Sequence, residues 1–344
     1  MIPSTTRMVV LRDRPGRGDD PTPDLFAVEE LPIPELQAGQ LLVRNIAMSV
    51  DPSMRGRLDL GEKHYTTNFE VGQPLDGSAV GEVIASEDER IPAGVVVRHR
   101  AGWREHAVVD ASTVAVVDTE AAPVGAWLGV LGQTGFTAWV GLKRIGELHQ
   151  GDVVFISAAA GAVGSAAGSF AKLLGASRVV GSAGGPDKVR QLVEQLGYDD
   201  AMDYRAESPR DAVRRLAPDG LDVYFDNVGG PHLVAALKNM RVNGRVALCG
   251  MISQYSDDGR GEDINNLIEA VLRRITIRGF IVRDHEDMRP EFEQTVAGWL
   301  RSGEVEALQT VTDGIDHAVD GFLGMLRGAN VGKALIRLDP NWDI

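Results

Sequence analysis

The feature that most restricts the fold is an apolar segment that runs directly into a glycine-rich turn. The segment reads Val153-Val-Phe-Ile-Ser-Ala-Ala-Ala-Gly-Ala-Val-Gly164, and a helix is expected at 164–174. The turn has the form Ala159-x-Gly161-x-x-Gly164, in which Gly161 lets the backbone approach a pyrophosphate and Gly164 lets the helix pack closely on the strand. The helix N-terminus adds N–H donors for an anion. A tight turn without a ligand is the alternative, but the strand before it and the helix after it favour a dinucleotide site.

The chain after this turn alternates strand-like and helix-like segments. Short apolar segments typical of buried strands lie at 153–157, 178–181, 201–204, 223–226 and 245–249, with helical segments between them at 187–196, 209–216 and 232–240. This alternation predicts βαβ units and hence a parallel, doubly wound α/β sheet of the Rossmann type. A strand at 275–282 comes late in the series, so we expect it near an edge of the sheet.

The residues before this region have the pattern of a separate β domain. Short β-branched or alternating segments at 8–11, 40–47, 78–85 and 107–109 are separated by Pro, Gly and Asp. The length of 344 residues exceeds what one hydrophobic core usually serves, so two domains are expected. A last strand at 332–338 could pair back into the first domain and make that domain discontinuous.

The end of the second Rossmann strand indicates which dinucleotide the turn holds. An NAD site usually has Asp or Glu there, to bind the ribose 2′-hydroxyl. Here the strand ends Val180-Gly-Ser-Ala-Gly-Gly185 with no acid, and Lys188 follows. Lysine can neutralise a 2′-phosphate as a point charge, although Lys188 alone would more simply be a solvated residue of the first helical turn. Taken with the missing acid, Lys188 predicts NADP(H).

Several segments, which span nearly the whole chain in order, carry a resemblance to a known family. They are Val50-Asp-Pro-Ser-Met-Arg-Gly-Arg57, Ala158-Ala-Ala-Gly-Ala-Val-Gly-Ser165, Ala183-Gly-Gly-Pro-Asp-Lys188, Asp203-Tyr204, Tyr224-Phe-Asp-Asn-Val-Gly-Gly230, Cys249-Gly-Met-Ile-Ser-Gln-Tyr255, Arg278-Gly-Phe-Ile-Val282 and Asn330-Val-Gly-Lys333. The chain resembles the zinc-independent branch of the medium-chain dehydrogenase/reductase superfamily. That branch contains prostaglandin reductases, plant alkenal double-bond reductases and bacterial curcumin reductases.

The resemblance implies a domain organisation and a set of cofactor contacts. A GroES-like β domain would comprise residues 1–127, completed by 305–344, and a Rossmann NADP-binding domain would comprise 128–304. Family members are commonly homodimers, which here implies pairing through the edge strand 275–282. The implied cofactor-binding residues are Gly161, Ala162, Val163, Gly164, Lys188, Tyr204, Asn227, Cys249, Gly250, Met251, Ile252, Ser253, Tyr255, Phe280, Ile281, Val282 and Asn330.

Tyr255 is the candidate catalytic residue. It follows the strand at 245–249 in a loop, where a doubly wound sheet exposes its ligand crevice. Its hydroxyl could donate a hydrogen bond to a substrate oxygen that gains negative charge. A tyrosine that only packs against the cofactor is the alternative.

Two departures from relatives bear on the chemistry. Zinc-dependent relatives have a Gly-His-Glu motif and metal-binding cysteines, whereas this chain has Gly77-Ser-Ala-Val-Gly-Glu82 and only one cysteine, Cys249. The sequence therefore predicts no metal site. Ser53 stands where the family often has a tyrosine that lines the substrate pocket, which predicts a different or roomier pocket.

Charge and hydropathy exclude some classes of partner. The net charge of −14 argues against a nucleic-acid partner, which needs clustered Lys and Arg. The sequence contains no apolar run of about 20 residues, so it predicts no membrane helix. We therefore expect a cytoplasmic protein. The expected activity is NADPH-dependent reduction of the C=C bond of α,β-unsaturated carbonyl compounds, as in an enone or 2-alkenal reductase. An NADPH quinone oxidoreductase and a non-catalytic NADPH-binding protein are the alternatives.

Overall fold

The α/β fold consists of two compact units. The computed structural model describes residues 2–16, 18–59, 67–254 and 264–344. Unit 1 comprises Met1–Gly129 together with Gln309–Ile344, and unit 2 comprises Val130–Leu308. No helix of the described residues is long and apolar enough to cross a membrane.

Unit 1 is built on a mixed sheet with strand order β14-β15-β3-β4-β5-β7, in which β6 also pairs with β3. The C-terminal strand β15 (Lys333–Arg337) pairs antiparallel with β3 (Gln40–Ser49), so the predicted last strand does return to the sheet of the N-terminal residues. The other elements are the paired strands β1 (Thr5–Leu11) and β2 (Phe26–Pro32), then α1 (Ser53–Gly56), β4 (Ala79–Ser86), β5 (Val96–His99), β6 (His106–Asp110), β7 (Ala115–Val116), β14 (Gln309–Asp313) and α9 (Ala318–Leu326).

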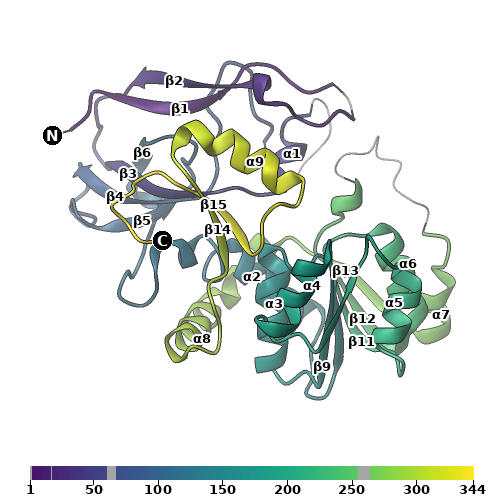
Figure 1. The fold of residues 1–344 in the computed structure, drawn as a ribbon. Coiled ribbons are helices and arrows are strands. Elements are labelled where there is room, and N and C mark those ends of the chain that lie inside the picture. Colours follow the sequence, from purple (N-terminus) through teal and green to yellow (C-terminus); the bar gives the residue numbers. More distant parts are fainter. Residues whose placement is uncertain (1, 17, 60–66, 255–263) are drawn as a thin grey trace. The chain divides into compact units, whose positions relative to one another are not determined.

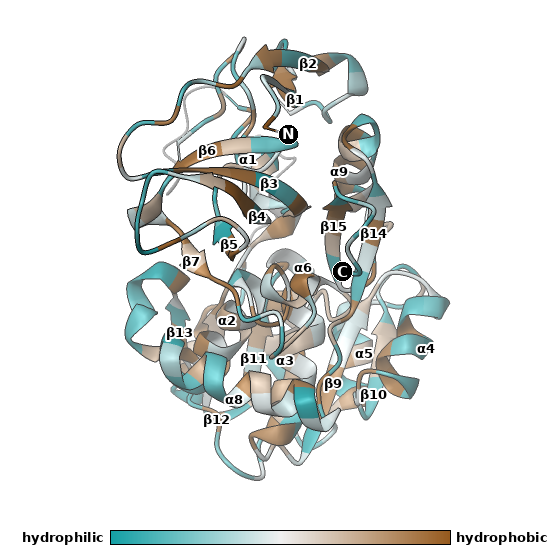
Figure 2. Ribbon diagram, turned by 90° about the vertical axis from the view of Figure 1, so that its left-hand side faces the viewer, coloured by the Kyte–Doolittle hydropathy of each residue, from teal (hydrophilic) through white to brown (hydrophobic). Residues whose placement is uncertain are grey.

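The core of unit 1 joins both ends of the sequence. Phe322 on α9 contacts the ring of Trp103 edge-on at a centroid distance of 5.9 Å and that of Phe26 at 6.3 Å. All three rings are buried, and β3, β4 and β15 carry brown, hydrophobic segments in Figure 2. The C-terminal helix is therefore held by apolar burial against strands formed early in the chain.

Unit 2 contains a parallel sheet with strand order β10-β9-β8-β11-β12-β13. In Figure 1, α3 and α4 lie on one side of this sheet and α5, α6 and α7 on the other, as in a doubly wound fold. The elements are α2 (Gln133–Val140), β8 (Val153–Ile156), α3 (Ala162–Leu173), β9 (Arg178–Ala183), α4 (Pro186–Glu194), β10 (Asp200–Asp203), α5 (Pro209–Leu216), β11 (Leu221–Asp226), α6 (Gly230–Asn239), β12 (Met240–Leu248), α7 (Ile268–Arg273), β13 (Thr276–Gly279) and α8 (Arg289–Ser302).

The last strand of this sheet is shorter than the sequence predicted. The expected strand at 275–282 is confirmed at the sheet edge, but β13 ends at Gly279, so Phe280, Ile281 and Val282 lie beyond it. The physical reason is its partner: β12 ends at Leu248, which is opposite Gly279, so the ladder has no further residues to pair with.

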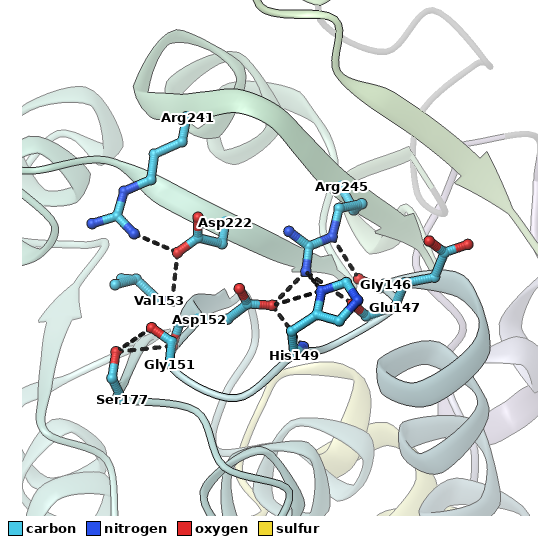
Figure 3. Close-up of polar contacts among 10 residues, drawn as sticks. All are labelled: Gly146, Glu147, His149, Gly151, Asp152, Val153, Ser177, Asp222, Arg241 and Arg245. Carbon is cyan, nitrogen blue, oxygen red and sulfur yellow. Dashed lines mark hydrogen bonds and ion pairs between the residues drawn. The ribbon is translucent and has the colours of Figure 1, made fainter.

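The amino ends of the central strands are tied together by a buried ion pair (Figure 3). Arg245 on β12 donates to the carboxylate of Asp152, and its side chain also donates to the carbonyl oxygens of Gly146 and Glu147 at 3.0 and 2.9 Å. Asp152 in turn accepts the N–H of His149 at 2.8 Å. The Arg245 side chain is only 14% exposed, so water cannot replace these contacts easily.

We predict that Arg245→Met destabilises the protein by about 2–4 kcal/mol, because it removes the cation that pairs with the Asp152 carboxylate and leaves two carbonyl oxygens without this donor. Urea unfolding measures the change. Arg241→Met is the matched control: Arg241 pairs with Asp222 on the same side of the sheet, but its side chain is 38% exposed. We expect this variant to cost about 1 kcal/mol or less. Equal losses in the two variants would contradict the prediction.

Candidate functional site

The glycine-rich turn after β8 presents backbone donors at the carboxyl edge of the parallel sheet. The N–H of Ala159 donates to the Ser182 carbonyl oxygen at 2.8 Å, which fixes the turn against β9. Gly161 is the N-cap of α3, and its carbonyl accepts the N–H of Ser165 at 2.8 Å. Because an N-cap glycine has no side chain to accept the first N–H groups of the helix, these donors remain available to an anion.

The two glycines of the turn differ in the space around them. A Cβ atom on Gly164 would lie 2.4 Å from the Ala158 carbonyl oxygen and 2.6 Å from the Ala159 Cα, so this residue allows the close packing of α3 on the turn. A Cβ atom on Gly161 would meet only the Ala158 oxygen, at 3.2 Å. Gly161 thus leaves an open approach to the N-terminus of α3, which fits a pyrophosphate.

Three polar side chains converge where β9 and β10 end. Lys188 lies on the first turn of α4, and Tyr204 and Arg205 directly follow β10. A Cβ atom on Gly184 would lie 2.9 Å from the Tyr204 Oη and 3.0 Å from the Arg205 Nε, so both atoms lie over this glycine. A hydroxyl and two cations therefore surround the end of β9, where an NAD site has an acid.

The charges at this position favour an anion. Burial, and then the positive charge of Arg205, lowers the pKa of Lys188, so the two cations are close enough to repel each other. An anion placed between them removes that repulsion. The nearby carboxylate of Asp203 is turned to the backbone, where its Oδ1 accepts the N–H groups of Gly185 and Arg205 at 2.9 and 3.0 Å. The donor set fits a phosphate group.

Hydrogen bonds also join the carboxyl ends of β8, β11 and β12. The side-chain amide of Asn227 donates to the Ser157 carbonyl oxygen, and its N–H donates to Ser157 Oγ, both at 2.8 Å. The N–H groups of Cys249 and Gly250 donate to the Asp226 carbonyl oxygen at 2.9 and 3.0 Å. Burial, and then the charge of Asp226, raises the pKa of the Cys249 thiol to about 12, so Cys249 is not a nucleophile near neutral pH.

A largely apolar pocket of about 440 Å³ lies where β12 and β13 end. It brings together five residues that the family resemblance assigns to the cofactor, and Asp284 is its charged lining residue. A flat ring such as nicotinamide fits a hollow of this kind. The lining residues are Leu248, Cys249, Gly250, Met251, Gly279, Phe280, Ile281 and Asp284.

The remaining sequence-derived candidates lie outside this pocket. Ile252 and Ser253 form a short 3₁₀ turn after it, and Val282 begins the next 3₁₀ helix. Asn330 and Ser53 belong to unit 1, where the Asn330 side chain donates to the Gly332 carbonyl oxygen at 2.8 Å and Ser53 begins α1. Their role in the site stays a prediction.

Two predictions concern residues or groups that this structure does not test. Tyr255 lies outside the described residues, so its catalytic role stays a prediction. In the part of the chain that the structure describes, no three His, Cys, Asp or Glu side chains are grouped to hold a metal ion.

Comparison with known proteins gives the family. Residues 7–117 match the family described as the N-terminal domain of oxidoreductase, and residues 162–298 match the one described as zinc-binding dehydrogenase. An NADP⁺-dependent 2-alkenal reductase from Nicotiana tabacum is 37% identical, over 89% of this chain and 89% of its own. The chain belongs to the medium-chain dehydrogenase/reductase superfamily.

Other members of the superfamily agree with this chain in sequence and in fold. The (+)-pulegone reductase from Mentha piperita is 36% identical, over 88% of this chain and 89% of its own. The crystal structure of CurA from Vibrio vulnificus in complex with NADPH has a TM-score of 0.90 and 32% identity, and covers 97% of this chain and 99% of its own. This medium-chain reductase thus belongs to the branch that its sequence motifs indicated.

Two residues of the site were missed by the sequence reasoning. Arg205 carried a usable signal, because it is a second basic residue directly after Tyr204 in a strand-to-helix connection. Asp226 carried a weaker one: it is an acid at the end of the apolar strand β11. In both cases some of the contacts that define the role come from distant elements: α4 brings Lys188 beside Arg205, and the ends of β8 and β12 bring Ser157 and Cys249 to Asp226.

Proposed function

We propose that this protein is an NADPH-dependent reductase of C=C bonds conjugated to a carbonyl group. Unit 2 is its NADP-binding domain, and the cofactor-binding residues are those that the family resemblance assigns, with Arg205 added. The observation that carries the proposal is the group formed by Lys188, Tyr204 and Arg205 beside the Gly161 turn. The two cations of this group, Lys188 and Arg205, suit the 2′-phosphate of NADPH. The related 2-alkenal and pulegone reductases, whose named substrates contain such a C=C bond, supply the substrate class.

NADPH bound at this site supplies the hydride for the reaction. The first N–H groups of α3 hold its pyrophosphate, and Asn227 and residues 249–253 orient the nicotinamide half. Tyr255 would donate a hydrogen bond to the substrate carbonyl oxygen, on which negative charge would build as the β-carbon accepts hydride. Solvent, directly or through Tyr255, supplies the proton to the α-carbon.

The test is NADPH oxidation against a panel of enones, 2-alkenals, quinones and saturated aldehydes, with product analysis. We expect turnover of enones and 2-alkenals to the saturated carbonyl compounds. Activity confined to quinones would replace the proposal with a quinone oxidoreductase. Tight NADPH binding with no turnover of any compound would indicate a non-catalytic NADPH-binding protein.

We predict that Tyr255→Phe lowers kcat by about tenfold to a hundredfold, because one hydrogen-bond donor to the developing negative charge is lost while the ring remains. The NADPH dissociation constant should barely change. Steady-state kinetics with one good enone, under conditions where hydride transfer limits the rate, measure the effect. Tyr204→Phe is the control and should act mainly on the KM for NADPH. An unchanged kcat in Tyr255→Phe would leave Tyr255 as a wall of the pocket only.

We also propose that two copies pair through the edge of the parallel sheet, as family members commonly do. The edge strand β13 has backbone groups that a second copy can extend. The adjoining helix α7 exposes apolar side chains: Val271 is 71% exposed, Leu272 62% and Ile268 59%. Exposed apolar residues gathered on one element are typical of an interface.

We predict that replacing Val271 and Leu272 together with aspartate halves the mass in solution, because the charges would have to be buried between the copies. Light scattering after size exclusion measures the mass. Val193→Asp, at an exposed apolar position on α4, is the control and should leave the dimer intact. A monomeric wild type, or a dimer in both variants, would count against this surface.

A cytoplasmic location stays a prediction of the sequence, which cell fractionation tests.

A further inference from the structure

Asp226 is a fully buried acid at the carboxyl end of β11, where its Oδ1 accepts four hydrogen bonds. The donors are Tyr224 Oη at 2.6 Å, the N–H groups of Gly229 and Val228 at 2.8 and 2.9 Å, and Ser157 Oγ at 3.1 Å. A buried carboxyl group is unfavourable unless it is hydrogen-bonded. The Oδ1 atom of Asp226 therefore fixes the turn that follows β11, because it accepts the N–H groups of Val228 and Gly229 in that turn.

The same residue connects three strand ends. Its carbonyl oxygen accepts the N–H groups of Cys249 and Gly250, which follow β12. Ser157, which follows β8 and donates to Asp226, also accepts the N–H of Asn227 at 2.8 Å. The side chain of Asp226, through Ser157, and its backbone carbonyl therefore join Asn227 to the start of the loop after β12.

The loop after β12 is docked on the turn that Asp226 shapes. The N–H of Ile252 donates to the Asn227 carbonyl oxygen at 3.2 Å. Ser253 donates to the Val228 carbonyl oxygen through its N–H at 3.2 Å and through its hydroxyl at 2.6 Å. The position of residues 249–253 thus depends on the conformation of residues 227–229.

We propose that Asp226 is a positioning residue of the hydride-transfer site: its Oδ1 sets the turn at 227–229 and thereby places Asn227 and residues 249–253 against the nicotinamide. This inference rests on the proposed function. Asp226 itself is buried beneath these residues and acts through them. Lys188 and the N-terminus of α3 hold the phosphate groups elsewhere, so the loss of Asp226 should affect hydride transfer more than NADPH affinity.

Two replacements of Asp226 separate the role of the acceptor from that of the charge. Burial raises the pKa of Asp226 above its ordinary value and outweighs the hydrogen bonds from Gly229 and Tyr224, which act in the opposite direction. Its Oδ2 is also buried and has no hydrogen-bond partner among the described residues. Asparagine keeps the Oδ1 acceptor without a charge, and alanine removes it.

The experiment compares Asp226→Ala and Asp226→Asn in the full chain, with Asp222→Asn as the matched control. Asp222 lies near the amino end of the same strand, where it accepts the N–H of Val153. The readouts are thermal unfolding, NADPH affinity by fluorescence, kcat with an enone, and hydrogen exchange of the amides at 228–229 and 249–250.

We expect Asp226→Ala to lower kcat by about tenfold to a hundredfold and to change the NADPH dissociation constant by less than about threefold. Exchange at the four amides should become faster. Asp226→Asn should bring kcat back to within about threefold of wild type, because the acceptor is restored. Asp222→Asn should lower stability and leave kcat and these amides unchanged.

Several results would overturn the proposal. These are a folded Asp226→Ala protein with wild-type kcat, an Asp226→Asn protein as impaired as the alanine variant, or an equal loss of kcat in Asp222→Asn. If Asp226→Ala does not fold, Ser157→Ala, which removes one donor to Asp226, must lower kcat by at least about threefold and speed exchange at Val228 and Gly229 for the proposal to stand. If the wild type reduces no enone, the proposed function fails, while amide exchange at Val228 and Gly229 still tests whether Asp226 sets the turn at 227–229.

Discussion

Replacing both Lys188 and Arg205 with alanine is expected to weaken NADPH binding by about a hundredfold to a thousandfold, while NADH binding changes little. Each charge-assisted contact to a phosphate contributes about 1.5–3 kcal/mol, or roughly tenfold to a hundredfold in affinity. The two losses should not add fully, because removing one cation relieves its repulsion of the other. Each single variant should lose about tenfold to a hundredfold in NADPH affinity.

Fluorescence titration of both cofactors measures the effect. Arg190→Ala is the matched control, because Arg190 lies two residues further along α4, is largely exposed and pairs with Asp187. It should leave both dissociation constants unchanged. If the affinity for NADH fell as much as that for NADPH, the two cations would not be reading the 2′-phosphate.

The second large effect is expected at Gly164. In Gly164→Ala, the new methyl group would lie 2.4 Å from the Ala158 carbonyl oxygen and 2.8 Å from that of Ala159. Both are backbone atoms that cannot rotate away, so α3 has to move off the turn. We expect a loss of about 3 kcal/mol in the free energy of unfolding and no measurable NADPH binding.

Gly161→Ala provides the matched comparison within the same turn. Its methyl group would meet only the Ala158 oxygen, at 3.2 Å, and φ at Gly161 is −80°, which alanine adopts freely. The stability should stay within about 1 kcal/mol of wild type, but NADPH should bind at least about tenfold more weakly, because the methyl group occupies the approach to the pyrophosphate. Urea unfolding and NADPH titration measure both variants. An unaltered stability in Gly164→Ala would refute the packing role.

The elements next to the turn were predictable because their determinants are local. An apolar strand, a glycine turn and a helix lie within about 20 consecutive residues, and each follows from side-chain periodicity and backbone freedom. The prediction of α5 at 209–216 was correct at both ends, since Ser208 caps the helix by accepting the N–H of Asp211 at 3.3 Å. Pro209 then occupies the first helical position.

The errors arose where an element depends on a distant partner. The strand at 275–282 was predicted too long, because only pairing with β12 decides where β13 ends. Periodicity alone cannot supply that limit, since the residues after Gly279 are as apolar as those before it.

The missed residues have the same origin. Arg205 has a specific role only because α4 brings Lys188 beside it, and Asp226 because Ser157 and the loop after β12 end at the same sheet edge. The ion pair of Arg245 with Asp152 joins residues 93 positions apart in the sequence. None of these pairs produces a local pattern that could be read along the chain.

The sequence by itself determined the α/β class, the glycine turn, the absence of an acid after the second strand and the family motifs that indicate an NADPH-dependent reductase. These properties depend on the periodicity of apolar residues and on residue types at short spacing. Both are present in the sequence whether or not the chain is folded. Only the tertiary structure decided the limits of the edge strand, the second cation beside Lys188 and the buried acceptor Asp226. The reason is that hydrogen bonds and charge repulsion act over a few ångströms, and only the folded chain brings such distant residues that close.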